Sequence, residues 1–321
     1  MTTALGLCLA VPPLELAAHR RLAGRAEQAG AAVLAVGEAR HDSFATAAMV
    51  ACSTSTTPVL TAVTTWVRSP VATARAARTL AELSGGRFTL GLGTMPPAWN
   101  RERHGIEVKR PLARLREYVA VVRAAAAAWA GAPVRFEGEF FTVTGYGDEI
   151  ASPPGHPVPV YLGVTRPATA RLAAEIADGA VVNIVHTGQW LRDRLVPATG
   201  GIPRVVMLRV VVHDGSPAGR AGALREAREA LTPYRPIPYF REIAHAEGLD
   251  PDELDDERLL SRFTAIGTLD EVRARVAEYA GLADVVLLAP PATLAPSRSA
   301  FCYDALLTLL PRPAPGPRGD G

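Results

Sequence analysis

Three short segments, each following an apolar run, carry the residue types that could do chemistry. Residues 38–44 contain a histidine followed by an aspartate. Residues 90–94 alternate glycine with leucine and end in threonine. Residues 163–167 form a turn that starts with glycine and ends with proline, directly before a helical pattern. These three segments are the candidates for a catalytic or ligand-binding site.

The turn at residues 163–167 has the composition of an anion site. Gly163 leads into a helix that begins at Pro167, so unpaired N–H groups and the helix dipole favour a negative charge there. Thr165 adds a hydroxyl and Arg166 a cation. The turn predicts either a phosphate cradle or an ordinary turn before a capped helix. It matches neither a GxGxxG nucleotide fingerprint nor a P-loop.

Gly91 and Gly93 interrupt an otherwise apolar strand pattern. Glycine weakens the interior of a strand, so its presence indicates that something approaches the backbone closely. That neighbour is either a flat ligand or another part of a tightly packed sheet.

His41 and Asp42 follow the second strand pattern. A histidine can exchange a proton near neutral pH and can donate a hydrogen bond to a carbonyl or phosphate oxygen. A lone histidine on a loop is otherwise simply solvated. No HxH or HExxH spacing accompanies it, so we expect no metal and no metal-dependent hydrolase.

The composition indicates a folded protein that is not a nucleic-acid binder. The 321 residues are 48% hydrophobic and 21% charged, which is enough apolar material for a large core. The net charge of +2 gives no basic excess for nucleic acid. No run approaches about 18 apolar residues, so we expect no membrane contact, and without a secretory signal pattern we expect a cytoplasmic location.

The three cysteines, Cys8, Cys52 and Cys302, lie far apart without a CxxC pair. We therefore expect buried small apolar side chains rather than disulfides or a redox site. Lys109 is the single lysine, and the preference for arginine, alanine, glycine and proline is typical of a GC-rich bacterial genome such as that of an actinobacterium.

Apolar runs alternate with amphipathic helical patterns along most of the chain. Ser69, Ser216 and Thr268 are predicted helix caps, the last in a capping box with Glu271. We expect strands at residues 4–10, 32–36, 59–63, 88–92, 158–162, 180–184, 205–212, 263–266 and 285–288.

Repeated strand–helix units predict a parallel sheet in an α/β fold, either open and doubly wound or closed into a barrel. About eight strands over about 300 residues favour a closed (β/α)8 TIM barrel, with functional groups on the loops after the strands. We expect a single domain over residues 1–310, a hairpin insertion at 134–143, a helical insertion at 231–261 and a Pro/Gly-rich tail at 311–321.

In combination these segments resemble the luciferase-like monooxygenase superfamily, most closely the branch that uses the deazaflavin coenzyme F420. The similarity covers most of residues 5–290. It is carried by residues 83–94, 159–163, 171–179, 114–119, 136–141 and 266–268.

The resemblance implies a luciferase-like barrel with the cofactor ring across the C-terminal ends of the strands. His41 and Asp42 match the polar pair of the family beside the reactive face of the ring, and the bond Ala62–Val63 matches a non-proline cis peptide common in the family. The residues that would bind the ring, tail and phosphate are Ala62, Val63, Gly91, Gly93, Thr94, Gly163, Val164, Thr165 and Arg166.

Two stretches depart from the pattern of the family, residues 95–100 and 183–198. The contacts to the cofactor tail and the substrate pocket therefore stay open. Trp66, Trp99, His186 and Trp190 are either an apolar pocket wall or ordinary barrel packing.

The resemblance implies hydride transfer between C5 of F420 and a small organic substrate, with His41 as proton donor or acceptor. An FMN-dependent monooxygenase is the alternative, because the two cofactors share a tricyclic ring, a ribityl chain and a phosphate. A cofactor-free barrel that binds a ligand is the third possibility. Members of the family are commonly homodimers, so we expect a dimer.

Overall fold

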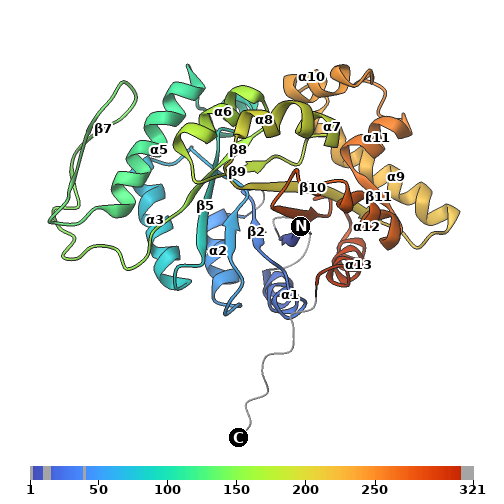
Figure 1. Cartoon of the computed structure of the whole chain (residues 1–321), viewed down its shortest axis with the longest axis horizontal. Coiled ribbons are helices and arrows are strands. Elements are labelled where there is room, and N and C mark those ends of the chain that lie inside the picture. The colour runs from blue at the N-terminus through green and yellow to red at the C-terminus, as the bar shows by residue number, and fades with distance from the viewer. Residues whose placement is uncertain (1–2, 10–15, 39–40, 312–321) are drawn as a thin grey trace, which may run out of the picture.

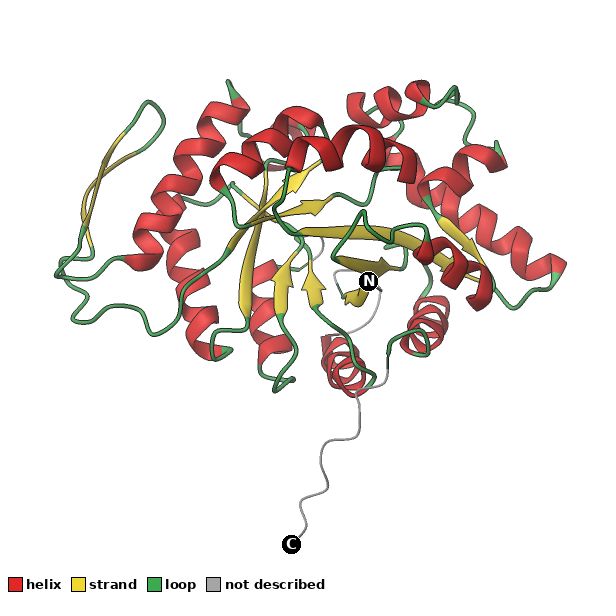
Figure 2. Ribbon diagram, viewed as in Figure 1, coloured by secondary structure: helices red, strands yellow, loops and turns green. Residues whose placement is uncertain are grey.

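A closed parallel barrel is the centre of the structure, a computed structural model that describes residues 3–9, 16–38 and 41–311. Eight strands of the described residues follow one another around it and helices surround them (Figures 1 and 2). The predicted (β/α)8 barrel is confirmed. In order around the barrel the strands are β1 (Ala4–Cys8), β2 (Leu34–Val36), β3 (Val59–Thr61), β5 (Phe88–Gly93), β8 (Val160–Val164), β9 (Gly179–Val182), β10 (Arg204–Val212) and β12 (Val285–Ala289).

The pairing of β9 with β10 and of β12 with β1 closes the sheet. Arg204 lies opposite Ala180, and Ala4 lies opposite Val285, in parallel register. Closure leaves no free edge on the barrel strands and brings all their C-terminal ends to one mouth.

Alternation along each strand divides the apolar side chains into two clusters. On β10, Val205 and Met207 belong to the inner cluster, whereas Val206 and Leu208 belong to the outer cluster under the helices. The inner cluster is built mostly from small or branched side chains, and it includes Ala62 near the mouth. Small inner residues at this end leave room for a cavity there.

The helices begin at the caps that the sequence predicts. Ser69 accepts from the N–H of Ala72, and Thr268 forms a capping box with Glu271. The helices are α1 (Leu16–Gln28), α2 (Ser43–Ala51), α3 (Pro70–Leu83), α4 (Pro97–His104), α5 (Pro111–Ala127), α6 (Pro167–Ile176), α7 (Gly188–Trp190), α8 (Val196–Thr199), α9 (Pro217–Leu231), α10 (Pro238–Ala246), α11 (Glu257–Phe263), α12 (Leu269–Ala277) and α13 (Pro296–Leu307), with a π-helix, η1 (Leu191–Leu195), and a 3₁₀ helix, η2 (Thr232–Tyr234).

Two insertions decorate the barrel. Strands β6 (Val134–Glu137) and β7 (Thr142–Tyr146) form the predicted hairpin, which projects beside α5 at the left of Figure 1. The region 231–261 is helical, as expected, and contains η2, α10 and part of α11.

Some boundaries differ from the prediction. The third strand ends at Thr61 rather than at residue 63, and β4 (Thr64–Thr65) resumes the pairing against β5. Strand β11 (Ala265–Gly267) pairs with the far end of β10 outside the barrel, because β10 is nine residues long and outruns its neighbours. Phe263 is helical.

Cys8 and Cys302 are buried as expected, but Cys52 is exposed, because it follows the last turn of α2. No described helix has the length and apolar content needed to cross a membrane. The predicted tail lies outside the described residues from position 312 onward.

Glu27, near the end of α1, ties this helix to the loop before β3, and we predict that it stabilises the fold through its charge. Its carboxylate accepts bonds of 2.8–3.0 Å from the N–H groups of Ser55, Thr56 and Thr57. Partial burial alone raises the pKa of Glu27, but these donors outweigh it and lower the pKa to about 2. We expect Glu27→Gln to cost about 1 kcal/mol at pH 7, after allowance for solvent screening.

The sign of the pH dependence follows from the lowered pKa. The stabilisation is complete above about pH 5 and is lost as the pH falls from 4.5 toward about 2. Urea unfolding at pH 7, 4 and 3 measures the gap between wild type and variant, with Glu229→Gln on α9 as the control. A gap that stays constant down to pH 3 would contradict this role.

Candidate active site

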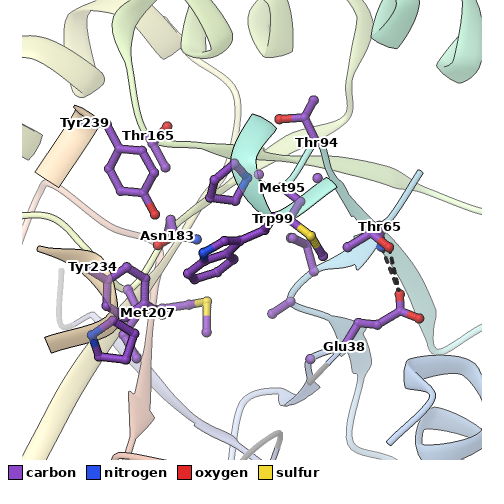
Figure 3. A pocket seen from close by; sticks show the side chains of 18 of the residues that line it. Glu38, Thr65, Thr94, Met95, Trp99, Thr165, Asn183, Met207, Tyr234 and Tyr239 are labelled. Carbon is purple, nitrogen blue, oxygen red and sulfur yellow. Dashed lines mark hydrogen bonds between the residues drawn. The ribbon is translucent and has the colours of Figure 1, made fainter. Parts of the chain in front are cut away.

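A cavity of about 600 Å³ opens at the mouth of the barrel (Figure 3). It lies where a TIM barrel places its functional groups, at the C-terminal ends of the strands. Each barrel strand, or the turn after it, contributes at least one lining residue: Cys8, Gly37, Ala62, Gly93, Gly163, Asn183, Met207 and Ala289.

The side chain of Val63 forms an apolar platform on one wall of this cavity. The bond Ala62–Val63 is cis, as the resemblance implies, and both residues line the cavity. A Cβ at Gly93 would lie 2.5 Å from Val63 Cγ2, and one at Gly163 would lie 3.3 Å from Val63 Cγ1. The two glycines therefore make the space that Val63 occupies.

Thr61 holds the backbone around this platform. Its Oγ1 donates to the carbonyl of Gly91 at 2.9 Å and accepts from the N–H of Gly91 at 2.8 Å. A Cβ at Gly91 would lie 1.8 Å from the Thr61 carbonyl oxygen. Gly91 is thus required for packing between the strands.

The N-terminus of α6 forms another wall of the cavity. Thr165, Arg166, Ala168 and Thr169 line it, and the first N–H groups of a helix have no partner inside the helix. The Arg166 guanidinium is half-exposed and forms an ion pair of 2.8 Å with Glu242 of α10. This wall can receive an anion.

Glu38 is the acidic side chain among the described lining residues. Its Oε2 accepts from Thr64 Oγ1 at 2.6 Å and from the N–H of Thr65 at 2.9 Å, with Thr65 visible beside it in Figure 3. Ser43 and the Thr65 hydroxyl approach the same oxygen at 3.4 and 3.5 Å. No hydrogen bond from the described part of the chain reaches Oε1.

Arg209 lines the cavity from β10 and is only 3% exposed. Burial lowers the pKa of its guanidinium, while the nearby Tyr234 and Tyr239 act in the opposite direction. Its Cζ lies 5.4 Å from the ring centroid of Tyr234, which belongs to η2. Figure 3 shows Tyr234 and Tyr239 on the side of the cavity away from Glu38.

Asn100 of α4 organises the loop that covers the platform. Its Nδ2 donates to the carbonyls of Thr94 and Met95 at 2.8 and 3.2 Å, and its Oδ1 accepts from Trp66 Nε1 at 3.2 Å. Met95 has a φ of 59°, a conformation that a residue with a side chain rarely adopts. Trp99 stacks under Arg103, whose Cζ is 3.9 Å from its ring.

The comparison with protein families agrees with this arrangement. The model of the luciferase-like monooxygenase family matches residues 7–284 of the chain. The chain belongs to this family.

Two luciferase-like relatives have names that describe an activity. The chain is 30% identical over 336 residues to a Mycobacterium tuberculosis protein provisionally named a coenzyme F420-dependent oxidoreductase, a match that covers 89% of this chain and 93% of that protein. It is 38% identical over 118 residues to 5,10-methylenetetrahydromethanopterin reductase of Archaeoglobus fulgidus. That match spans only 37% of this chain and 33% of the reductase. These names support an oxidoreductase.

Solved luciferase-like structures share the fold. An F420-dependent secondary alcohol dehydrogenase in complex with an F420–acetone adduct superposes with a TM-score of 0.73 at 17% identity, over 90% of this chain and 94% of that chain. A type II Baeyer–Villiger monooxygenase from Pseudomonas putida in complex with FMN has a TM-score of 0.72 at 17% identity, over 97% of each chain. At this identity the likeness extends to the fold alone.

The cavity of this luciferase-like barrel brings together most of the residues expected at the cofactor. Two of the four aromatic residues expected in the substrate pocket also line it. The residues that meet there are Ala62, Val63, Gly93, Thr94, Gly163, Thr165, Arg166, Trp66 and Trp99.

Six residues with predicted roles are not among the lining residues. Asp42 caps α2 by accepting from the N–H of Ala45 at 2.9 Å, and it pairs with Arg68. His41 immediately precedes this cap. Val164 faces the helices because its neighbour Gly163 faces the cavity, and Gly91 packs against Thr61.

His186 and Trp190 lie behind the cavity wall rather than in it. His186 is buried, with Nδ1 2.7 Å from the Asn183 carbonyl oxygen, and burial lowers its pKa to about 4. Trp190 donates from Nε1 to the Thr165 carbonyl at 3.1 Å, so it supports the turn before α6 from outside.

Sequence reasoning missed Glu38, Arg209, Asn100 and the tyrosines of residues 231–261. Glu38 belongs to the candidate segment 38–44, but the sequence pattern favoured His41 as the proton carrier, because a histidine exchanges protons near neutral pH. Arg209 had a usable signal, because a charge inside an apolar strand pattern is rare unless it has a partner or a function. The tyrosines had none, since nothing local places an insertion over a barrel mouth.

We predict that Asn100 is essential to the loop above the platform. Asn100→Ala would leave the Trp66 N–H and the carbonyls of Thr94 and Met95 without their partner in a buried place, at a cost of about 2–3 kcal/mol. Urea unfolding measures this loss, with Glu102→Ala on the exposed side of α4 as the matched control. A loss no larger than that of the control would remove Asn100 from this role.

Proposed function

We propose that this protein is an F420-dependent oxidoreductase that exchanges a hydride between the deazaflavin and a small organic substrate. The observation that carries the proposal is a single cavity that joins the Val63 platform to the N-terminus of α6. A flat ring with an anionic tail matches those two features. The name of the Mycobacterium tuberculosis relative, which includes coenzyme F420, supports the same cofactor.

The residues present fit such a cofactor. Gly93 and Gly163 leave room for the Val63 side chain, so Val63 can pack against both strands and a ring can lie against it. Thr165, Arg166 and the first N–H groups of α6 would hold the phosphate, because a helix N-terminus favours negative charge. When bound, the deazaflavin supplies the carbon that accepts or returns the hydride.

Glu38 is placed to move the proton that accompanies the hydride. When an alcohol is oxidised to a carbonyl compound, the carbon loses a hydride and the hydroxyl loses a proton. Oε1 of Glu38 can accept that proton, while bonds from Thr64 and Thr65 hold Oε2 in place. In the reverse direction the same group returns it. We therefore assign to Glu38 the role that the sequence suggested for His41.

An FMN-dependent monooxygenase is the alternative, because the Baeyer–Villiger structure with FMN shares the fold. Both cofactors have a flat ring and a phosphate, so the shape of the cavity does not distinguish them. A binding titration with each cofactor does. Failure to bind either cofactor would support the third possibility, a cofactor-free barrel that binds a ligand.

We predict that the purified chain binds F420 more tightly than FMN and that Arg166 contributes to this affinity. Arg166→Glu puts a carboxylate at the phosphate wall and should weaken F420 binding roughly tenfold or more. Fluorescence titration measures both cofactors. Arg171→Glu, an exposed position on the same helix, is the matched control.

The outcomes of this titration are distinct. Tight FMN binding with oxygen consumption by the reduced enzyme would favour the monooxygenase. Equal affinity in the Arg166 and Arg171 variants would place the phosphate elsewhere.

We predict that Glu38→Gln reduces turnover about 100-fold or more while changing F420 affinity little, because proton transfer at this position contributes to the chemical step. His41→Ala should leave turnover within a few-fold of wild type. Steady-state kinetics with a panel of alcohols and carbonyl compounds, alongside F420 titration, measures both. The reverse ranking of the two variants would return the proton to His41.

A further inference from the structure

Arg209 is a buried cation that lines the cavity, and no carboxylate of the described residues forms an ion pair with it. It stands in the apolar run of β10, two residues after Met207, and like Met207 it faces the cavity. Its Nη1 is buried and has no hydrogen-bond partner. In the described part of the chain no carboxylate lies within ion-pair distance of it.

The other charged residues that line the described part of the cavity are two arginines and one glutamate, and none of them forms an ion pair with Arg209. Arg166 is paired with Glu242, and Arg103 stacks on Trp99. Glu38 is bonded to Thr64 and lies across the cavity from Tyr234, which contacts Arg209. An unpaired charge in such a place is costly, so burial of an arginine is ordinarily accompanied by an anion.

We propose that Arg209 binds an anionic group of the substrate, a carboxylate, sulfonate or phosphate, at the β10 side of the cavity. This inference rests on the proposed function, since it identifies the class of substrate that the oxidoreductase takes. The planar guanidinium presents several N–H donors in a fixed geometry that matches the oxygens of such groups.

The surroundings of Arg209 define the rest of the substrate. Tyr234 packs its ring 5.4 Å from the guanidinium carbon and 5.8 Å from the ring of Trp99, while Pro233 and Ala230 line the same side. These neighbours are largely apolar. A substrate with an apolar body next to its anionic group would therefore be preferred, with its reacting carbon directed toward Glu38 and Val63.

This anion site is separate from the one at α6. Arg166 follows β8, whereas Arg209 is within β10, and β9 stands between the two strands. A cofactor phosphate at α6 and a substrate anion at Arg209 can therefore be present together. With two separate sites the substrate anion does not compete with F420, whereas with a single anion site it does.

The test uses pairs of compounds that differ in charge alone. We would titrate 4-phenylbutyrate against 4-phenylbutyramide, and benzenesulfonate against benzenesulfonamide, with phenyl phosphate as a third anion, into the full chain with and without F420. We expect at least a tenfold preference for one of the anions over its neutral analogue. Arg209→Met should abolish that preference, and Arg103→Met should retain it.

A second measurement covers folding. Because Arg209 is buried and its Nη1 has no hydrogen-bond partner among the described residues, we expect Arg209→Met to raise the apparent Tm of the ligand-free chain by about 2 °C or more. A purely structural arginine would give a lower Tm instead. Arg209→Lys, which keeps the charge but loses the planar group, should retain part of the preference.

Several results would overturn the inference. Equal affinity for the acids and the amides, or a preference that survives in Arg209→Met, removes the anion site. Displacement of F420 by the anion assigns Arg209 to the cofactor instead. If F420 does not bind at all, the proposed function fails, yet an Arg209-dependent preference in the cofactor-free chain still supports the anion site itself.

Discussion

The mouth of this barrel depends on one place between β3 and β5 where a side chain, rather than the backbone, bonds to the neighbouring strand. Regular pairing stops after Leu60, and the Thr61 side chain then bonds both backbone groups of Gly91. This frees the chain to turn through Ala62 and Val63 before pairing resumes at Thr64. The side chain of Val63 consequently rests on Gly93 and Gly163 and becomes the apolar wall on which the proposed chemistry takes place.

The charged side chains around that wall differ in how far they are buried and in whether they have a partner. Thr64 and Thr65 hold one oxygen of Glu38, and Arg166 is half-exposed and paired with Glu242. Arg209 is buried, and no carboxylate of the described residues pairs with it. Charges interact more strongly in a cavity of low dielectric constant than in water. The cavity thus has a polarity of its own, negative beside β2 and positive beside β10, which would orient an asymmetric substrate.

Helix α4 and the helical insertion at residues 231–261 supply the parts of the cavity that the barrel alone lacks. Strand ends give the platform and Glu38, but α4 carries Trp99 and Asn100, and η2 with α10 brings Tyr234 and Tyr239 over Arg209. Loops and insertions on a rigid scaffold commonly determine what an enzyme binds. Residues 95–100, where the sequence departs from the luciferase-like pattern, belong to this group, so the departure falls where substrate selection would be expected.

The sequence by itself determined the barrel, its caps, a short turn into α6 and the position of the cis bond, because these depend on local patterns or on motifs of the family. The turn is shorter than predicted, since β8 continues to Val164. Only the tertiary structure decided which side chains meet. Consecutive residues of a strand face opposite sides of the sheet, so Gly163 faces the cavity and Val164 does not. Asp42 caps α2, and Gly91 packs against Thr61. Arg209 and Tyr234 come from separate elements and lie in contact. Such contacts join residues distant in sequence, and no local pattern encodes them.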